Sequence, residues 1–154
     1  MHRPSTWALV SNGTHAFILK GLEGKDRPAP VALVSEDTST KLGEIMADKP
    51  GRSFASGADG RRSAMEPGSD PLHRQMEVFA KDTLARLEKH HLASEFERLA
   101  IFAAPKMLGV LRKEMPGGLK DAIMLERAAN LVHLPEHDLR DTVVSELHDA
   151  RWGE

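Results

Sequence analysis

The sequence predicts an α/β fold with a mixed sheet, and three observations lead to this prediction. Two short β-rich runs near the N-terminus are joined by Asn12-Gly13, the strongest short-range signal of a β-hairpin. A third β-rich run follows, and a long amphipathic helix pattern begins at Pro71. Beyond this helix, apolar runs alternate with shorter helices, as in parallel βαβ crossovers. The predicted order of elements is therefore β-β-β-α-β-α-β-α.

The first three elements are expected to be antiparallel strands at Thr6–Val10, His15–Leu19 and Val31–Glu36. All three runs are rich in β-branched, aromatic or other apolar residues. Asn12-Gly13 should close the hairpin between the first two, because both residues tolerate a positive φ. A polar connection with two prolines, residues 21–30, separates the second strand from the third.

The clearest predicted element is a helix from Pro71 to His90. Asp70-Pro71 offers a cap acceptor followed by proline at the first helical position. Apolar and small residues recur at the spacing of one buried helix face. The residues expected on this face are Leu72, Met76, Phe79, Ala80, Thr83, Leu84 and Leu87. His90 and His91 follow Lys89 at the C-terminal end, where positive charge suits the helix dipole, and both should be solvated.

The C-terminal third should supply two more strands and their helices. The continuous apolar run Leu99–Ala104 suits a central strand that is covered on both faces. A helix at Lys106–Met115, a helical turn at Leu119–Ile123 and a strand at Met124–Leu131 should follow. Pro135 can start a final helix with Leu139, Val143, Leu147 and Ala150 on one face. Antiparallel strands followed by βαβ crossovers give a ribonuclease H-like mixed sheet with helices on its faces.

Length and composition indicate one soluble domain over residues 1–154. The chain is 40% hydrophobic and 29% charged, which is ordinary for a globular protein. A formal net charge of −2 excludes a generally basic nucleic-acid binder, so any such contact must be local. The chain has no cysteine, hence no disulfides and no thiolate metal site. Without an apolar leader or an apolar run long enough to span a membrane, a cytoplasmic location is expected.

The segment at about residues 48–70 shows neither a helix nor a strand pattern. Glycine, serine and proline dominate it, so it should be a mobile loop. Its centre is basic, with three arginines against Asp59 alone. Together with the start of the following helix it supplies the candidate binding residues, which are Arg52, Ser53, Arg61, Arg62, His73 and Arg74. The alternative interpretation is a surface insertion without a function.

The sequence predicts neither a catalytic site nor a metal site. His133 to His137 spell H-x-x-E-H, the inverted zinc-protease motif, but Pro135 should begin the last helix and leave His133 outside it. A nuclease on such a sheet needs converging carboxylates, and the first strand carries none. Ser53 and Ser56 lack a base of evident placement. We therefore expect no catalytic residue, no metal and no cofactor.

Several stretches resemble the bacterial host attachment protein family, whose members are required for attachment to host cells. These stretches are the hairpin WALVSNGTHAFIL, the segments DKPGRSF and GRRSAMEPGSDP, the helix sequence EVFAKDTLARLE, and RLAIFAAPKMLGVLR. The resemblance extends from Trp7 to Leu147. The family is in turn similar to the middle domain of archaeo-eukaryotic peptide release factors and of the ribosome-rescue protein Pelota.

This resemblance implies two functions. In release factors, a basic loop before a long helix carries Gly-Gly-Gln into the peptidyl-transferase centre. Residues 57–60 here read Gly-Ala-Asp-Gly, so the hydrolytic motif is missing while the basic loop remains. The first implied function is a non-enzymatic protein that contacts ribosomal RNA or tRNA through this loop. The alternative is a factor that supports bacterial attachment through a host or cell-surface partner.

Overall fold

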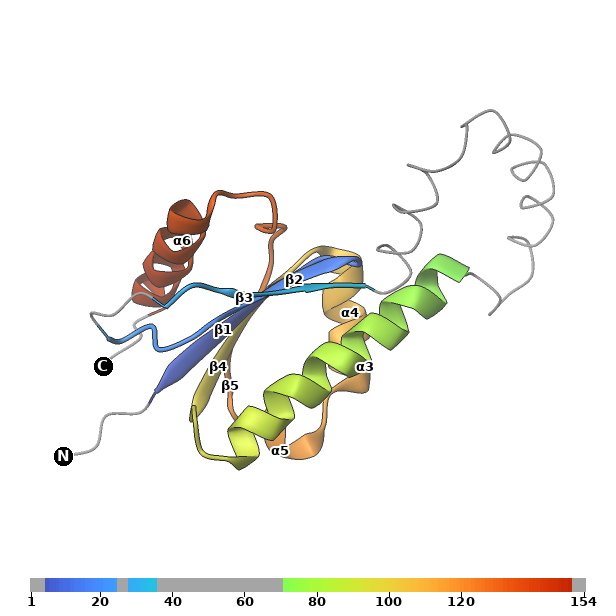
Figure 1. Ribbon diagram of the computed structural model, residues 1–154, viewed down its shortest axis with the longest axis horizontal. Helices are drawn as coiled ribbons and strands as arrows, with labels where there is room; N and C mark the ends of the chain where they lie inside the picture. Colours follow the sequence, from blue (N-terminus) through green and yellow to red (C-terminus); the bar gives the residue numbers. More distant parts are fainter. Residues whose placement is uncertain (1–4, 25–27, 36–70, 151–154) are drawn as a thin grey trace.

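The computed structural model describes residues 5–24, 28–35 and 71–150 (Figure 1). Within these ranges the strands are β1 (Thr6–Ser11), β2 (His15–Leu19), β3 (Val31–Val34), β4 (Arg98–Ala103) and β5 (Ile123–Ala128). The helices are α3 (Pro71–Leu92), α4 (Pro105–Glu114), α5 (Gly117–Lys120) and α6 (Glu136–Asp149). Each predicted helix and strand has a counterpart, but the helical turn expected at Leu119–Ile123 lies at Gly117–Lys120, and Ile123 begins β5. The last strand ends at Ala128, three residues before the predicted end, and Leu131 already belongs to a turn in which its carbonyl accepts the Leu134 N–H.

The strands of the described residues form one mixed sheet in the order β3-β2-β1-β4-β5. β1 and β3 each pair antiparallel with β2, whereas β4 pairs parallel with both β1 and β5. The parallel pairs follow from the helical connections, since a crossover helix returns the chain to the same end of the sheet. The predicted α/β class with a mixed sheet is thereby confirmed.

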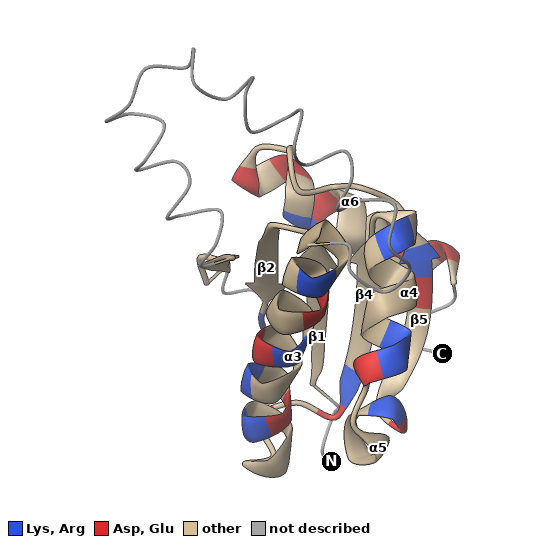
Figure 2. Ribbon diagram, turned by 90° about the vertical axis from the view of Figure 1, so that its right-hand side faces the viewer, with Lys and Arg blue, Asp and Glu red and all other residues tan. Residues whose placement is uncertain are grey.

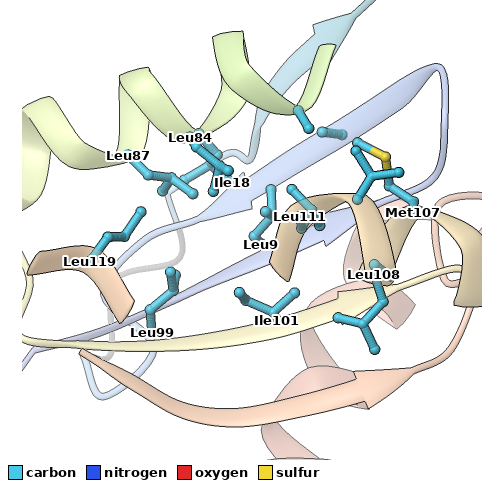
Figure 3. Packing of buried hydrophobic residues seen from close by; sticks show 14 of the residues in the cluster. Leu9, Ile18, Leu84, Leu87, Leu99, Ile101, Met107, Leu108, Leu111 and Leu119 are labelled. Carbon is cyan, nitrogen blue, oxygen red and sulfur yellow. The ribbon is translucent and has the colours of Figure 1, made fainter. Parts of the chain in front are cut away.

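Helices cover both faces of the sheet (Figure 1). Alternate residues of β1 and β4 face α3 and α4, where Leu9 and Ile101 pack against Leu84 and Leu111 (Figure 3). The residues in between, such as Phe102, face the other way and pack with Leu139 and Val143 of α6. Both central strands are therefore covered on two faces, as the continuous apolar run of β4 predicted.

The buried face of α3 agrees with the predicted pattern except at its start. Its buried residues are Phe79, Ala80, Thr83, Leu84 and Leu87, and Met76 is half-buried against them. The prediction that Leu72 belongs to the core is wrong, because this residue is 65% exposed. The first turns of α3 extend past the ends of the described strands, so no described strand lies beneath this end of the helix (Figure 1). Ala150 is likewise exposed, since α6 ends at Asp149.

The hairpin turn forms where Asn12-Gly13 predicted it, but not for the predicted reason. Among the described residues, only Ser94 and Gly21 have a positive φ. The Asn12 side chain closes the turn instead, because its Oδ1 accepts the backbone N–H groups of Thr14 at 2.9 Å and His15 at 2.8 Å. Gly13 is needed for space, since an added Cβ would lie 3.1 Å from Cγ of Met76.

The prediction that His90 and His91 are simply solvated is wrong. The His90 ring lies 5.1 Å from the buried Trp7 ring, and its Nδ1 lies 3.0 Å from Oε1 of Glu95. The His91 ring lies 5.2 Å from the ring of Phe96, which stacks on Trp7 at 4.8 Å. The end of α3 is thus held against the start of β1 by a cluster of rings.

Candidate functional site

Most of the predicted binding residues lie outside the part of the chain that the structure describes. These are Arg52, Ser53, Arg61 and Arg62, together with the whole expected loop at 48–70. His73 and Arg74 are described, and both are exposed in the first turns of α3. His73 and Arg74 are therefore neighbours on the exposed start of α3.

His73 has a structural partner of its own. Its Nε2 lies 3.5 Å from Oε2 of Glu77, one turn along the helix, and the same oxygen accepts from Nζ of Lys113 at 3.4 Å. Lys113 belongs to α4, so Glu77 joins the two helices. Because His73 and Lys113 are exposed and Glu77 is only half-buried, the contacts contribute little to stability.

The outer side of α3 carries charges of both signs (Figure 2). Glu77, Asp82 and Glu88 are interspersed with Arg74, Lys81, Arg86 and Lys89. A surface that binds nucleic acid gathers positive charge on one face. The described part of α3 does not have this character, so phosphate contact would depend on the arginines of the loop.

The more distinctive described feature is the edge of the sheet at β3. Strand order places β3 outermost, with β2 on its inner side and no described strand on its outer side. Its four residues, Val31–Val34, are all apolar, and none is charged. Edge strands are commonly protected by charged residues, bulges or proline, because their free backbone groups invite another strand. β3 itself contains no charged residue and no proline.

The hydrogen bonds of the hairpin determine which groups of β3 face outward. The Ser35 N–H donates to the carbonyl of Thr14 at 2.8 Å, so Ser35 faces β2. Backbone groups alternate in direction along an antiparallel strand. Leu33 and Val31 therefore also face β2, whereas the N–H and C=O groups of Ala32 and Val34 point away from the sheet. None of the described residues outside the sheet bonds to these groups, so within the described part of the chain they form an open hydrogen-bonding edge.

A groove of about 320 Å³ runs between this edge and α3, and we call it the edge groove. Residues 32–35 form one side of it. The other side is a stripe of α3 at helical spacing, formed by Gln75, Val78, Phe79, Asp82, Thr83 and Arg86. The apolar part of the lining includes Phe79 and Val78, and Val78 is 56% exposed. The lining of the edge groove is therefore mixed, with somewhat more polar than apolar surface.

Thr83 is the unusual residue of the edge groove. It is only 1% exposed, and its hydroxyl has no hydrogen-bond partner among the described residues. An unpaired buried hydroxyl costs folding free energy, so native proteins rarely retain one without a reason. Rotation about its Cα–Cβ bond exchanges the hydroxyl with the methyl group, and helical threonine populates two such rotamers. The hydroxyl can thus turn toward a group that enters the groove.

The opposite edge of the sheet, at β5, is protected. Oε1 of Glu126 lies 2.6 Å from Nε of Arg112 on α4. Nε of Arg127 lies 3.2 Å from Oε1 of Glu146 on α6. Charged pairs therefore flank β5 toward both helix layers, which discourages the addition of another strand. The two edges of the sheet are built differently, because among the described residues charged pairs flank β5 and none flanks β3.

Sequence reasoning missed this site, although one signal was present. Thr83 was expected on the buried face of the helix, where it is the only hydroxyl among apolar residues. A threonine in such a place indicates either a local hydrogen bond or a contact still to be made. The position of β3 at the edge had no comparable signal, because strand order depends on the whole sheet.

Within residues 5–24, 28–35 and 71–150, no group of three or more metal-ligating side chains is placed to hold an ion. The H-x-x-E-H stretch is divided as predicted, since α6 begins at Glu136 after Pro135 and His133 precedes it. His137 pairs with its neighbour Asp138 at 3.0 Å. None of the helices in these ranges is long and apolar enough to cross a membrane.

Comparison with known proteins supports the resemblance seen in the sequence. The model of a family described as "Protein required for attachment to host cells" matches residues 7–143. No curated protein matches this chain. The match covers β1 to most of α6 and therefore includes both sides of the edge groove.

Proposed function

Because this chain belongs to the family of proteins required for attachment to host cells, we propose that it acts in attachment as a non-enzymatic binding protein. Its partner in this proposal is a protein of the host or of a cell surface. The observation that carries the proposal is the edge groove, which joins an uncharged sheet edge to a half-apolar helix face. Such a surface suits contact with another polypeptide better than it suits chemistry on a small substrate.

The test compares two substitutions of an exposed apolar residue by glutamate on the same helix. Val78 lies in the edge groove, whereas Leu92, 77% exposed, lies at the far end of α3. We expect Val78→Glu, placed in the native gene, to reduce adherence to host cells, while Leu92→Glu leaves adherence unchanged. Deletion of the gene gives the lower limit. Unchanged adherence after deletion would refute the role in attachment, whereas equal effects of the two variants would refute only the groove.

A second candidate function is contact with ribosomal RNA or tRNA, and the basic segment of the sequence favours it. Arg52, Arg61 and Arg62 stand there against Asp59. Arginine binds phosphate through a planar fork of donors, which suits an irregular RNA surface. This second candidate function also assumes that the protein is cytoplasmic, that its sheet is ribonuclease H-like and that it is similar to the middle domain of release factors.

Co-sedimentation with ribosomes across a salt series tests the second candidate. The double variant Arg61→Ala, Arg62→Ala should bind more weakly, with a log-log salt slope reduced by about 0.7–0.9 for each lost phosphate contact. Circular dichroism provides the folding control. If the wild type does not co-sediment even at low salt, this function is refuted and attachment stands alone.

A further inference from the structure

We propose that the edge groove binds an extended peptide segment of a protein partner, which adds to β3 as a further strand. This inference deepens the proposed binding function and names the form of the partner. It depends on the outward backbone groups, on the exposed Val78 and the neighbouring Phe79 of α3, and on the Thr83 hydroxyl, which has no partner among the described residues. Each of these features is explained by a strand that occupies the groove.

The backbone supplies the affinity. Ala32 and Val34 present two N–H donors and two carbonyl acceptors along the open edge, as the Ser35–Thr14 hydrogen bond requires. A peptide in extended conformation satisfies all of these groups. Strand addition of this kind obtains binding energy from main-chain hydrogen bonds and selectivity from alternate side chains.

The alternation of side chains decides which peptide residue enters the groove. Val31 and Leu33 pack toward the α3 layer, so Ala32 and Val34 point to the other face of the sheet. On an added strand, the residue opposite Leu33 points the same way as Leu33. Its side chain therefore enters between β3 and α3, beside Val78, Phe79 and Thr83.

The lining of the groove then defines the chemistry of that peptide residue. Phe79 and Val78 offer apolar contact, while the Thr83 hydroxyl offers one hydrogen bond. The residue that fits has an apolar stem and a hydrogen-bonding tip, as threonine and glutamine have. Asp82 and Arg86 lie one helical turn apart on the rim and make no ion pair with any described residue. They complement a peptide with charges of both signs.

The dimensions of β3 favour a peptide over a second copy of this chain. Four residues of strand extend about 13 Å. Pairing of two such strands alone falls well short of the roughly 1,200–2,000 Å² that stable protein interfaces bury. A peptide needs only the edge and the groove beside it.

The decisive substitution is Ala32→Pro, because proline removes the outward N–H of residue 32 without removing a hydrogen bond to β2. Proline is tolerated on an edge strand when its nitrogen faces outward. Ala32→Val is the matched control, since it adds similar bulk and keeps the N–H. Thermal unfolding checks that both variants fold, and Val34→Pro replaces Ala32→Pro if the latter does not.

The probe is a displayed library of random linear dodecapeptides, selected against the full chain. Recovered peptides are synthesised, and their affinities are measured by fluorescence anisotropy. We expect wild type and Ala32→Val to bind alike, and Ala32→Pro to bind at least tenfold more weakly. Thr83→Val should weaken binding by about three- to tenfold, the effect of one hydrogen bond. Peptide should also slow hydrogen exchange at the amides of Ala32 and Val34.

Three results would overturn the proposal. The first is a selection that yields no binding peptide. The second is a set of peptides that bind Ala32→Pro as well as they bind wild type, or that leave exchange at Ala32 and Val34 unchanged. The third is a wild-type dimer that Ala32→Pro converts to monomer, which would assign the edge to self-association. None of these results bears on whether loss of the gene reduces attachment, so the two proposals fail separately.

Discussion

Replacing Thr83 with valine should make the protein more stable, which is unusual for a substitution at a buried position. Thr83 is 1% exposed, and its hydroxyl has no partner among the described residues. It lies on the face of α3 that packs on the sheet, between Phe79 and Leu87. Valine has nearly the same shape and replaces the hydroxyl by a methyl group, so it removes the unpaired polar atom without leaving a cavity.

The expected gain follows from the cost of burying that hydroxyl. A buried polar group without a partner costs about 1–3 kcal/mol. Threonine and valine have similar helix propensities, so the backbone contributes little to the difference. We expect the free energy of unfolding to rise by about 1 kcal/mol. For a chain of this size, such a gain raises the midpoint of thermal unfolding by about 2–4 °C.

Urea unfolding followed by circular dichroism measures this change. Thr83→Ser is the matched control, because it keeps the hydroxyl and loses only the methyl group, and it should destabilise the fold. A fall of more than about 1 kcal/mol in Thr83→Val, the size of a lost hydrogen bond, would mean that the hydroxyl is bonded in the free protein. Thr83 would then be a structural residue and no longer a reason to expect a ligand.

Three further substitutions test the structure elsewhere. Phe79→Ala should lower the free energy of unfolding by about 3–5 kcal/mol, whereas a loss below about 1 kcal/mol would place Phe79 outside the core. Asn12→Ala should cost about 1–3 kcal/mol by removing the acceptor that closes the hairpin turn, while Asn12→Asp keeps that acceptor and should cost less; equal losses would show that the side chain is not what closes it. Ser94→Gly should stabilise by about 0.5–1 kcal/mol in thermal unfolding, because Ser94 has a φ of 60° at the end of α3, and a destabilised variant would contradict that geometry.

The elements could be predicted because their signals are local. The spacing of apolar residues along α3 identified its buried face, and the continuous apolar run of β4 identified a strand covered on both faces. Leu72 was assigned wrongly for the same reason. Periodicity shows which face of a helix is apolar, but not how far the sheet beneath it extends.

The site could not be predicted in the same way, because it depends on arrangement. β3 resembles any short apolar strand until the order of the sheet makes it an edge. The sequence predicted that His90 and His91 are solvated. In the fold they contact the rings of Trp7 and Phe96, which come from two other parts of the chain. The arginines at positions 52, 61 and 62 were the conspicuous feature of the sequence. The edge groove, in contrast, is formed by residues that make up no recognisable motif.

The contrast between the two edges is the strongest physical reason to regard β3 as a binding element. A sheet that needed only to fold would gain from protection at both edges, since free strand edges promote aggregation. Here β5 is flanked by the Arg112–Glu126 and Arg127–Glu146 pairs, whereas β3 has four uncharged residues. One lysine at Ala32 or Val34 would protect that edge at little structural cost, because both side chains are exposed. Such a lysine should leave the free energy of unfolding unchanged and abolish peptide binding. It is therefore the simplest change that tests whether adherence to host cells depends on this edge and not on the stability of the fold.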